Sequence, residues 1–286
     1  MAEVRDITES YRLGRVLKSS PGGIVFRATD PGTGRQVAIK LIPADGQGRV
    51  LLRREYAMLA RLLHPGLPRV HELMRTGQTL ALVSELIEGQ PLDSWWAGRP
   101  LPEVVQALAQ LLGILDFWHR RGVLHCDVKP DNVLVAQTGV RLVDLGLAVA
   151  LGDEGPTSGT AGYIAPEVLA GERPSIGSDL YAVGVLLFQA VWGRPPFEGA
   201  ADQIVAQQLQ RDVELPREGA SEGLRAVVRQ LLAREPARRP SSAAETLGLL
   251  EELEPESVLS ADRIPIPRGS AFERHRCRRS PKKTMG

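Results

Sequence analysis

The chain has 286 residues, 43% of them hydrophobic and 24% charged, which is the composition of a folded globular protein. Its formal net charge of +1 excludes a strong global field that would attract nucleic acid or a membrane surface, so we expect no nucleic-acid partner. The two cysteines, Cys126 and Cys277, form no CxxC pair, which argues against a disulfide framework or a zinc site and suits a reducing compartment.

The first residues and the strongest apolar run were compared with the patterns of a signal peptide and of a membrane-spanning helix. The first ten residues lack a basic stretch followed by an apolar one, so they do not predict a signal peptide. The strongest apolar run, 180–192, is shorter than the roughly 20 residues that span a bilayer, and it is interpreted as a buried helix. We therefore expect a cytoplasmic protein with no membrane anchor in this chain.

The region 11–84 is predicted to be a small antiparallel sheet with one helix. Short β-rich runs are separated by Gly and Pro turns, at 16–17, 24–28, 36–42, 69–75 and 80–84. Apolar residues at helical spacing between the third and fourth runs predict a helix over 49–63, which ends before Pro65.

From Leu92 onward the pattern is mainly helical. Helices are predicted at 102–120, 178–192, 200–210, 219–233 and 241–253, and short strands at 133–135 and 140–143. The body therefore divides into a β-rich N-lobe and a helical C-lobe joined at 85–89. The basic, Pro-containing tail at 254–286 has few apolar residues, and we expect it to be disordered.

Lysine is rare in this chain, which makes each internal lysine informative. The five lysines are Lys18, Lys40, Lys129, Lys282 and Lys283, and every other basic residue except His is Arg. An internal lysine therefore indicates a site that needs a compact ammonium rather than a planar guanidinium. Lys40 ends the apolar strand Val37-Ala38-Ile39, and Glu55 on the following helix can hold its ammonium. By itself such a strand is usually an edge strand.

The loop 125–132, with sequence HCDVKPDN, follows a helix and precedes a strand. Asp127 can accept or orient a hydroxyl proton, Lys129 can neutralise a transferring phosphoryl group, and Asn132 offers an amide oxygen to a hard cation. An isolated polar loop would be interpreted as a turn, but this spacing of His, Asp, Lys and Asn is specific.

Asp144-Leu145-Gly146 stands at the end of a predicted strand. Its carboxylate can hold Mg²⁺, although a plain Asp-x-Gly turn is the commoner explanation of such a sequence. The magnesium hypothesis gains weight because Asn132 lies twelve positions earlier, in the matching order.

Three later motifs complete a pattern: GTAGYIAPE at 159–167, SDLY at 178–181 and RPS at 239–241. With them, residues 11–253 resemble a eukaryotic-type (Hanks-type) serine/threonine protein kinase, and the Arg-rich, Lys-poor composition favours a bacterial member. The resemblance implies an α+β, two-lobed kinase fold with an N-lobe at about 11–84, a hinge at 85–89 and a C-lobe at about 90–253. It also implies ATP and Mg²⁺ as cofactors and a protein as the substrate.

The resemblance assigns roles residue by residue. Lys40 should bind the α- and β-phosphates and pair with Glu55, Asp127 should be the catalytic base, and Lys129 should assist it. Asn132 and Asp144 should hold the metal. Adenine should lie among apolar side chains and meet main-chain groups of the hinge, at Leu17, Val25, Ala38, Leu134, Glu85 and Ile87. Glu167 should pair with Arg239, Asp179 should brace the catalytic loop, and Thr160 is typical of the serine/threonine branch.

The sequence departs from the family pattern at four places, one of which, Leu145 in place of the usual Phe, should have little consequence. The glycine-rich loop falls on KSSPGG at 18–23, where only Gly23, with Gly22 beside it, is retained for phosphate contact. Lys18 could contribute a compensating positive charge there, but it is interpreted as a solvated surface lysine. Cys126 replaces the usual Arg, so phosphorylation of the activation segment should matter less. Ser84 guards the back of the adenine pocket and should leave a cavity there.

Two alternatives to an active kinase stay open at this stage. A pseudokinase that serves as a binding or scaffold module would explain the degenerate loop and Cys126. A small-molecule phosphotransferase of related fold is disfavoured by the peptide-docking segment at 165–167. The input signal should come from a regulatory protein partner, the tail or another chain.

Overall fold

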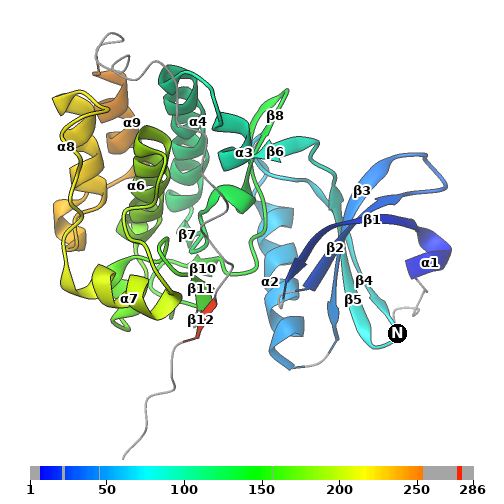
Figure 1. The fold of residues 1–286 in the computed structure, drawn as a ribbon. Coiled ribbons are helices and arrows are strands. Elements are labelled where there is room, and N and C mark those ends of the chain that lie inside the picture. The colour runs from blue at the N-terminus through cyan, green and yellow to red at the C-terminus, as the bar shows by residue number, and fades with distance from the viewer. Residues whose placement is uncertain (1–6, 21–22, 45, 157, 254–275, 279–286) are drawn as a thin grey trace, which may run out of the picture. The chain divides into compact units, whose positions relative to one another are not determined.

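A computed structural model describes residues 7–20, 23–44, 46–156, 158–253 and 276–278. The chain divides into two compact units (Figure 1). The first consists of Met1–Gly89 and Arg141–Gly146, and the second of Gln90–Val140 and Leu147–Gly286. The β-rich and helical parts agree with the predicted α+β class, but the sequence did not indicate that 141–146 belongs to the first part.

The first unit is built on a five-stranded antiparallel sheet with the order β1-β2-β3-β5-β4. Its strands are β1 Arg12–Ser20, β2 Gly23–Thr29, β3 Gln36–Pro43, β4 Val70–Thr76 and β5 Thr79–Glu85. The predicted positions are confirmed for all five, and β1 is longer than the apolar pair 16–17 because pairing with β2 extends it.

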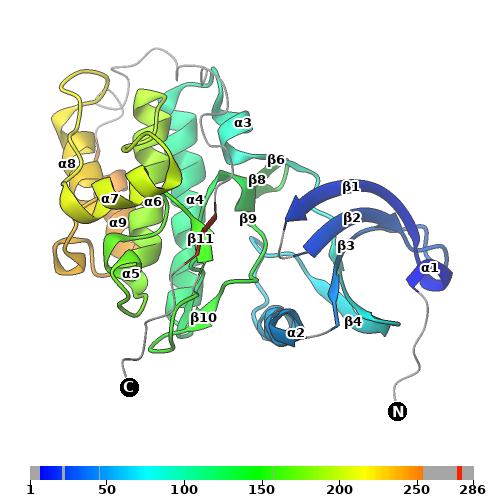
Figure 2. The same cartoon turned by 60° about the horizontal axis from the view of Figure 1, so that its bottom comes forward.

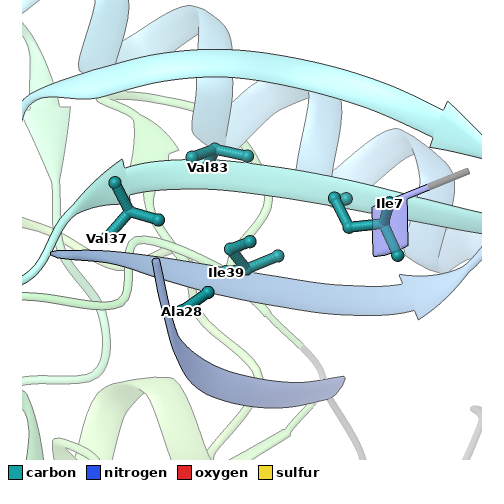
Figure 3. Packing of buried hydrophobic residues seen from close by; sticks show 6 residues of the cluster. Ile7, Ala28, Val37, Ile39 and Val83 are labelled. Atoms are coloured by element: carbon teal, nitrogen blue, oxygen red, sulfur yellow. The ribbon is translucent and has the colours of Figure 1, made fainter. Parts of the chain in front are cut away.

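Both faces of this sheet bury apolar side chains, because successive residues of a strand point to opposite faces. One face packs against α1 (Ile7–Ser10) through the cluster drawn in Figure 3: Ile7, Ala28, Val37, Ile39, Ala81 and Val83. A second cluster, from the sheet and α2 (Gly46–Arg61), contains Ile42, Leu52, Leu80 and Leu82. Since Val37 and Ile39 point to the first face, Ala38 and Lys40 point to the face that α2 covers.

The returning segment Arg141–Gly146 is bonded to the rest of the first unit. The N–H of Leu142 donates to the carbonyl of Gly66 at 2.8 Å. The Arg141 guanidinium donates from Nη2 to the carbonyl of Leu67 at 3.0 Å and to Glu85 Oε2 at 2.8 Å. These bonds fix the backbone two residues before Asp144.

The second unit is mainly helical, as predicted. Its helices are α3 Leu92–Trp96, α4 Leu101–His119, α5 Pro166–Leu169, α6 Ile176–Trp192, α7 Ala201–Gln210, α8 Glu222–Leu231 and α9 Ala243–Glu251. Short 3-10 turns occur at Pro130–Asn132 and Pro236–Arg238. Figure 2 shows α4 and α6 side by side at the centre of this unit.

Helix α6 is the buried helix predicted from the apolar run at 180–192. It begins with a reciprocal capping box between Ser175 and Ser178, in which the Ser175 N–H donates to the Ser178 hydroxyl at 3.0 Å. It ends at Gly193, whose φ of 67° is the left-handed conformation that glycine adopts without steric cost. This register places Asp179 in the first turn, facing inward at 1% exposure.

Three small sheets are made of short strands. Strand β7 Val123–Leu124 pairs with β10 Val149–Ala150, and β11 Ser158–Thr160 pairs with β12 Arg276–Arg278. In the third sheet, β8 Val133–Ala136 lies between β6 Gly89–Pro91 and β9 Gly139–Leu142. Strand β12 belongs to the predicted tail. The rest of 254–286 lies outside the described residues, where disorder stays a prediction.

Candidate active site

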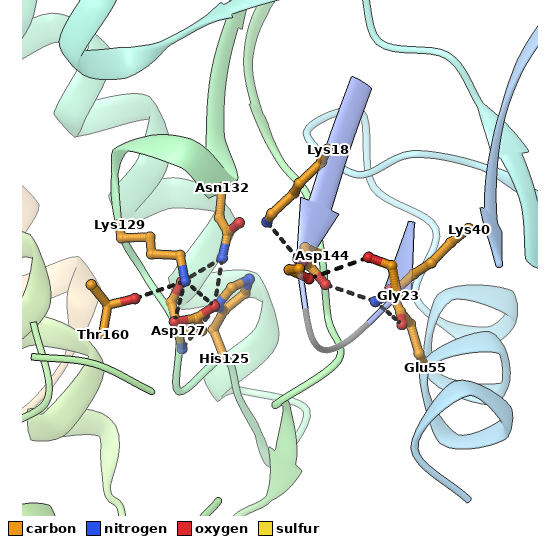
Figure 4. A network of polar contacts seen from close by, with 11 residues as sticks. Lys18, Gly23, Lys40, Glu55, His125, Asp127, Lys129, Asn132, Asp144 and Thr160 are labelled. Carbon is orange, nitrogen blue, oxygen red and sulfur yellow. Dashed lines mark hydrogen bonds and ion pairs between the residues drawn. The ribbon is translucent and has the colours of Figure 1, made fainter. Parts of the chain in front are cut away.

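The first unit contains a half-buried group of charges around Lys40 (Figure 4). Lys40 Nζ lies 2.8 Å from Glu55 Oε2 and 2.8 Å from Asp144 Oδ1. Strand β3 supplies the ammonium, α2 supplies Glu55, and the returning segment supplies Asp144, so three separate stretches of sequence meet here. The predicted Lys40–Glu55 pair is present, and its side chains are only 15% and 4% exposed.

The backbone at Asp144 and Gly146 explains this sequence locally. Asp144 has a φ of 66°, an uncommon left-handed conformation that aspartate tolerates better than most residues. A Cβ atom at Gly146 would lie 3.1 Å from Lys40 Nζ and 3.3 Å from Asp144 Oδ1. A side chain at 146 would therefore press on the ammonium and the carboxylate, which would have to shift by a few tenths of an ångström.

Lys18 completes this group, contrary to the prediction of a solvated surface lysine. Its Nζ lies 2.7 Å from Asp144 Oδ2, and its side chain is 24% exposed. Both carboxylate oxygens of Asp144 therefore face an ammonium. Burial of Asp144 disfavours its charged form, but the attraction of Lys40 and Lys18 prevails and holds the pKa of this carboxyl well below its usual range.

The second unit holds a separate group in the loop between β7 and β8. Lys129 Nζ lies 2.8 and 2.7 Å from the two carboxylate oxygens of Asp127, and 2.9 Å from the Thr160 hydroxyl. Asn132 is fully buried, and its Nδ2 donates to the Asp127 carbonyl and to Asp127 Oδ2, both at 2.8 Å. Two of the polar residues predicted in this loop, Lys129 and Asn132, therefore contact the third, Asp127 (Figure 4).

Asp179 braces the backbone of that loop, as predicted. Its Oδ2 accepts from the His125 N–H and its Oδ1 from the Cys126 N–H, both at 2.8 Å. His119 Nε2 lies 2.9 Å from Oδ2. Burial disfavours the charged carboxylate, yet the contacts with His119 and His125 leave the pKa of Asp179 lowered. The two N–H bonds hold Cys126 at a φ of 62°, which is strained for a residue with a side chain.

The predicted structural bridge between Glu167 and Arg239 is present and buried. Arg239 donates from Nη1 and Nη2 to the two oxygens of Glu167, each at 2.8 Å, and the side chains are 0% and 5% exposed. The Ser178 hydroxyl also donates to Glu167 Oε1 at 2.7 Å. This bidentate pair connects α5, which contains Glu167, to the segment just before α9, which contains Arg239.

The residues expected around adenine occupy the following places. Val25 on β2 lies opposite Lys40 on β3, and Ala38 on β3 lies opposite Ser84 on β5. The N–H of Glu85 donates to the Arg69 carbonyl at 2.7 Å. Leu17 on β1 is 41% exposed, and Ile87 follows β5. Leu134 lies on β8, outside the first unit. Their contact with a base stays a prediction.

Of the two glycines expected to contact the phosphates, the structure describes only one. Gly22 lies outside the described residues. Gly23 has a φ of 123°, and a Cβ there would lie 2.6 Å from both Ile42 Cγ2 and the Leu41 carbonyl oxygen. Close packing of β2 on β3 is therefore sufficient to require glycine at 23, whatever its role toward phosphate.

The chemistry of the proposed metal ligands fits magnesium. Mg²⁺ prefers carboxylate and carbonyl oxygens, and it is usually bound by one or two protein groups together with substrate phosphates. Asp144 supplies a carboxylate, and the Asn132 Nδ2 contacts orient its amide so that Oδ1 points away from Asp127 (Figure 4). Within the described ranges, no group of three or more His, Cys, Asp or Glu side chains could hold a metal alone.

One further finding concerns membranes. Among the helices that the structure describes, none has the length and apolar character required to cross a bilayer.

Comparisons with known proteins identify relatives over most of the chain. The family described as "Protein kinase domain" matches residues 11–248. The serine/threonine-protein kinase PknL of Mycobacterium bovis is 34% identical over 96% of this chain and 74% of its own length. The serine/threonine-protein kinase PkaA of Streptomyces coelicolor is 34% identical over 86% of this chain and 50% of its own length.

A solved structure resembles the fold. The autoinhibited serine kinase domain of the giant muscle protein titin aligns with a TM-score of 0.76 over 88% of this chain and 85% of that chain, at 22% identity.

Proposed function

Because the chain belongs to the protein kinase family, we propose that it is a protein-serine/threonine kinase that transfers the γ-phosphoryl group of Mg-ATP to Ser or Thr hydroxyls. The observation that carries this function is the complete set of polar groups that phosphoryl transfer needs. The first unit supplies Lys40, Glu55 and Asp144, and the second supplies Asp127, Lys129 and Asn132.

Lys40 binds the α- and β-phosphates. Its ammonium is fixed in place by Glu55, so no side-chain entropy is lost when phosphate oxygens replace part of its contact with Asp144. A compact ammonium can face two phosphate oxygens at once, which suits the scarcity of lysine elsewhere in the chain.

Asp127 orients the acceptor hydroxyl and takes its proton. Both of its oxygens face Lys129, and the Asn132 amide fixes the carboxylate further. Lys129 then offsets the charge on the transferring phosphoryl group, so that this loop positions the acceptor and stabilises charge together. Lys129 bonds to Thr160, and both residues are the ones that the family resemblance associates with the serine/threonine branch.

Asp144 would hold the metal through a carboxylate oxygen, and Asn132 would hold it through an amide oxygen. When bound there, Mg²⁺ would neutralise phosphate charge. We assign the chain to the cytoplasm because the reaction consumes ATP. Control of the enzyme is assigned to a regulatory protein partner, since Cys126 gives the activation segment no guanidinium with which to bind its own phosphate.

The pseudokinase alternative has no specific observation in its favour. Its two arguments were the degenerate glycine loop and Cys126, but neither removes a group that touches the reacting atoms. Purified chain incubated with Mg²⁺ and labelled ATP, beside Lys40→Met and Asp127→Asn, separates the two functions. We expect label in protein only with the unaltered chain. Folded wild-type protein that labels neither itself nor a generic Ser/Thr substrate would support the binding module.

A further inference from the structure

Lys18 stands where kinases of this family carry the first glycine of the phosphate loop, and its side chain reaches the proposed metal ligand. Lys18 Nζ lies 2.7 Å from Asp144 Oδ2, while Lys40 Nζ holds Oδ1 at 2.8 Å. The contact lies within the first unit. A lysine at this place is a feature of this chain that the proposed function does not use.

The register of the sheet explains how two lysines meet one carboxylate. Lys18 lies opposite Val25 on β2, and Val25 lies opposite Lys40 on β3. Residues directly opposite one another in an antiparallel sheet point to the same face, so both ammonium groups project to one side. Two irregularities in β1, between Leu13 and Val16 and between Val16 and Lys18, set this register.

The charges of the group are balanced only when Lys18 is counted. Lys18 and Lys40 contribute two formal positive charges, and Glu55 and Asp144 contribute two formal negative charges. The side chains of Lys18 and Asp144 are 24% and 26% exposed, so the contact is partly screened from water but still accessible to an incoming ligand. Without Lys18, the group keeps one excess negative charge at the place where phosphates arrive.

We propose that Lys18 is a built-in counter-cation of the metal site, which holds Asp144 Oδ2 until a metal ion takes that oxygen. This inference rests on the proposed role of Asp144 as a metal ligand. It has two linked consequences. Mg²⁺ must displace an ammonium, so metal binds less readily than it would to a carboxylate without this contact. In the absence of metal, Lys18 reduces the repulsion between Asp144 and a nucleotide, so metal-free nucleotide binds more tightly.

The expected size follows from the kind of bond involved. A hydrogen bond between charged, partly exposed groups corresponds to a change of about tenfold in an equilibrium constant. We therefore expect Lys18→Gln to weaken metal-free ADP binding about tenfold and to lower the half-saturating Mg²⁺ concentration by a similar factor. With saturating Mg²⁺, ADP affinity should change little. The variant loses the attraction between the Lys18 ammonium and the phosphates, but Lys18 also no longer competes with Mg²⁺ for Asp144, and the two effects offset each other.

The test is a titration of ADP by calorimetry, in EDTA and over a range of Mg²⁺ concentrations. Lys18→Gln removes the charge at similar length, and Lys18→Arg, which keeps the charge, should behave like wild type in EDTA. Arg15→Gln is the matched control, because it removes one positive charge from an exposed position of the same strand. Mg²⁺ alone, followed by thermal unfolding, is a second readout that needs no nucleotide: Lys18→Gln should be stabilised at lower Mg²⁺.

The outcomes separate this inference from the proposed function. If Lys18→Gln weakens ADP equally with and without metal, Lys18 is a simple phosphate ligand and the counter-cation role is wrong. The role is also wrong if Lys18→Gln matches wild type and Arg15→Gln throughout. If wild type binds no ADP, or if Asp144→Asn keeps the full dependence on Mg²⁺, the proposed function or the role of Asp144 has failed instead.

Discussion

Replacing Asp179 by Asn should destabilise the protein and slow the reaction, because one buried carboxylate positions the catalytic loop. The carboxylate accepts the N–H groups of His125 and Cys126 and contacts His119. Asparagine has a single acceptor oxygen, so one buried N–H loses its partner at a cost of about 1–3 kcal/mol. The left-handed Cys126, which stores about 1–3 kcal/mol of strain, is then held less firmly.

We expect Asp179→Asn to lower the free energy of unfolding by about 1–3 kcal/mol, which is the cost of the N–H group that loses its partner. In urea denaturation followed by circular dichroism, that loss moves the midpoint down by about 1 M. The kcat should fall more than the KM for ATP changes, since Asp127 follows directly on the displaced backbone. Cys126→Gly in the Asp179→Asn background should recover about 1 kcal/mol, because glycine adopts the left-handed conformation without strain.

The pH dependence of stability gives an independent check on Asp179. Its pKa in the folded protein is lowered relative to the unfolded chain, where a free Asp has a pKa of about 3.9. The carboxylate therefore contributes stability above that unfolded value, and the contribution is lost as pH falls through the folded pKa. Wild type should lose more stability than Asp179→Asn between about pH 5 and pH 3. Parallel pH profiles, or an Asp179→Asn variant with normal stability and kcat, would refute this account of the loop.

Three further variants test other parts of the site. Arg239→Met leaves Glu167 charged and buried, so unfolding free energy should drop by about 3–5 kcal/mol; a thermal midpoint equal to that of wild type would contradict this. Gly146→Ala brings a methyl group within 3.1 Å of Lys40 Nζ, so kcat should fall about tenfold while the folded structure, measured by circular dichroism, is retained. Wild type should be inhibited by ATP analogues with a bulky adenine substituent, and Ser84→Met should weaken that inhibition about tenfold; unchanged inhibition would show that the hinge is misplaced.

Much of the candidate site could be predicted because its residues lie on elements with strong local signals. Lys40 lies on a β-rich strand and Glu55 lies on the helix that follows, so their contact at 2.8 Å needs only the packing of one helix on one sheet. The loop group is local as well, since Asp127, Lys129 and Asn132 lie within six positions of one another. Their spacing alone brings them together at the end of a short strand.

The contact of Lys18 with Asp144 could not be predicted, although the scarcity of lysine pointed to Lys18 as much as to Lys40. The face of the sheet to which the Lys18 side chain points depends on two irregularities in β1, and no local pattern in the sequence marks them. Gly23 is a similar case, because the need for glycine arises from Ile42 and Leu41 on the neighbouring strand. Both features depend on strand register, which is set by the whole sheet rather than by nearby residues.

The discontinuity of the first unit affects how the protein is made. This unit needs Arg141–Gly146, which the ribosome supplies more than fifty residues after Gly89. A nascent chain or a fragment that stops at Gly89 lacks the Asp144 carboxylate that Lys40 faces and the Arg141 bond to Glu85. We expect such a fragment to be an incomplete folding unit, so the N-terminal sheet should gain its full resistance to proteases only once residue 146 has emerged.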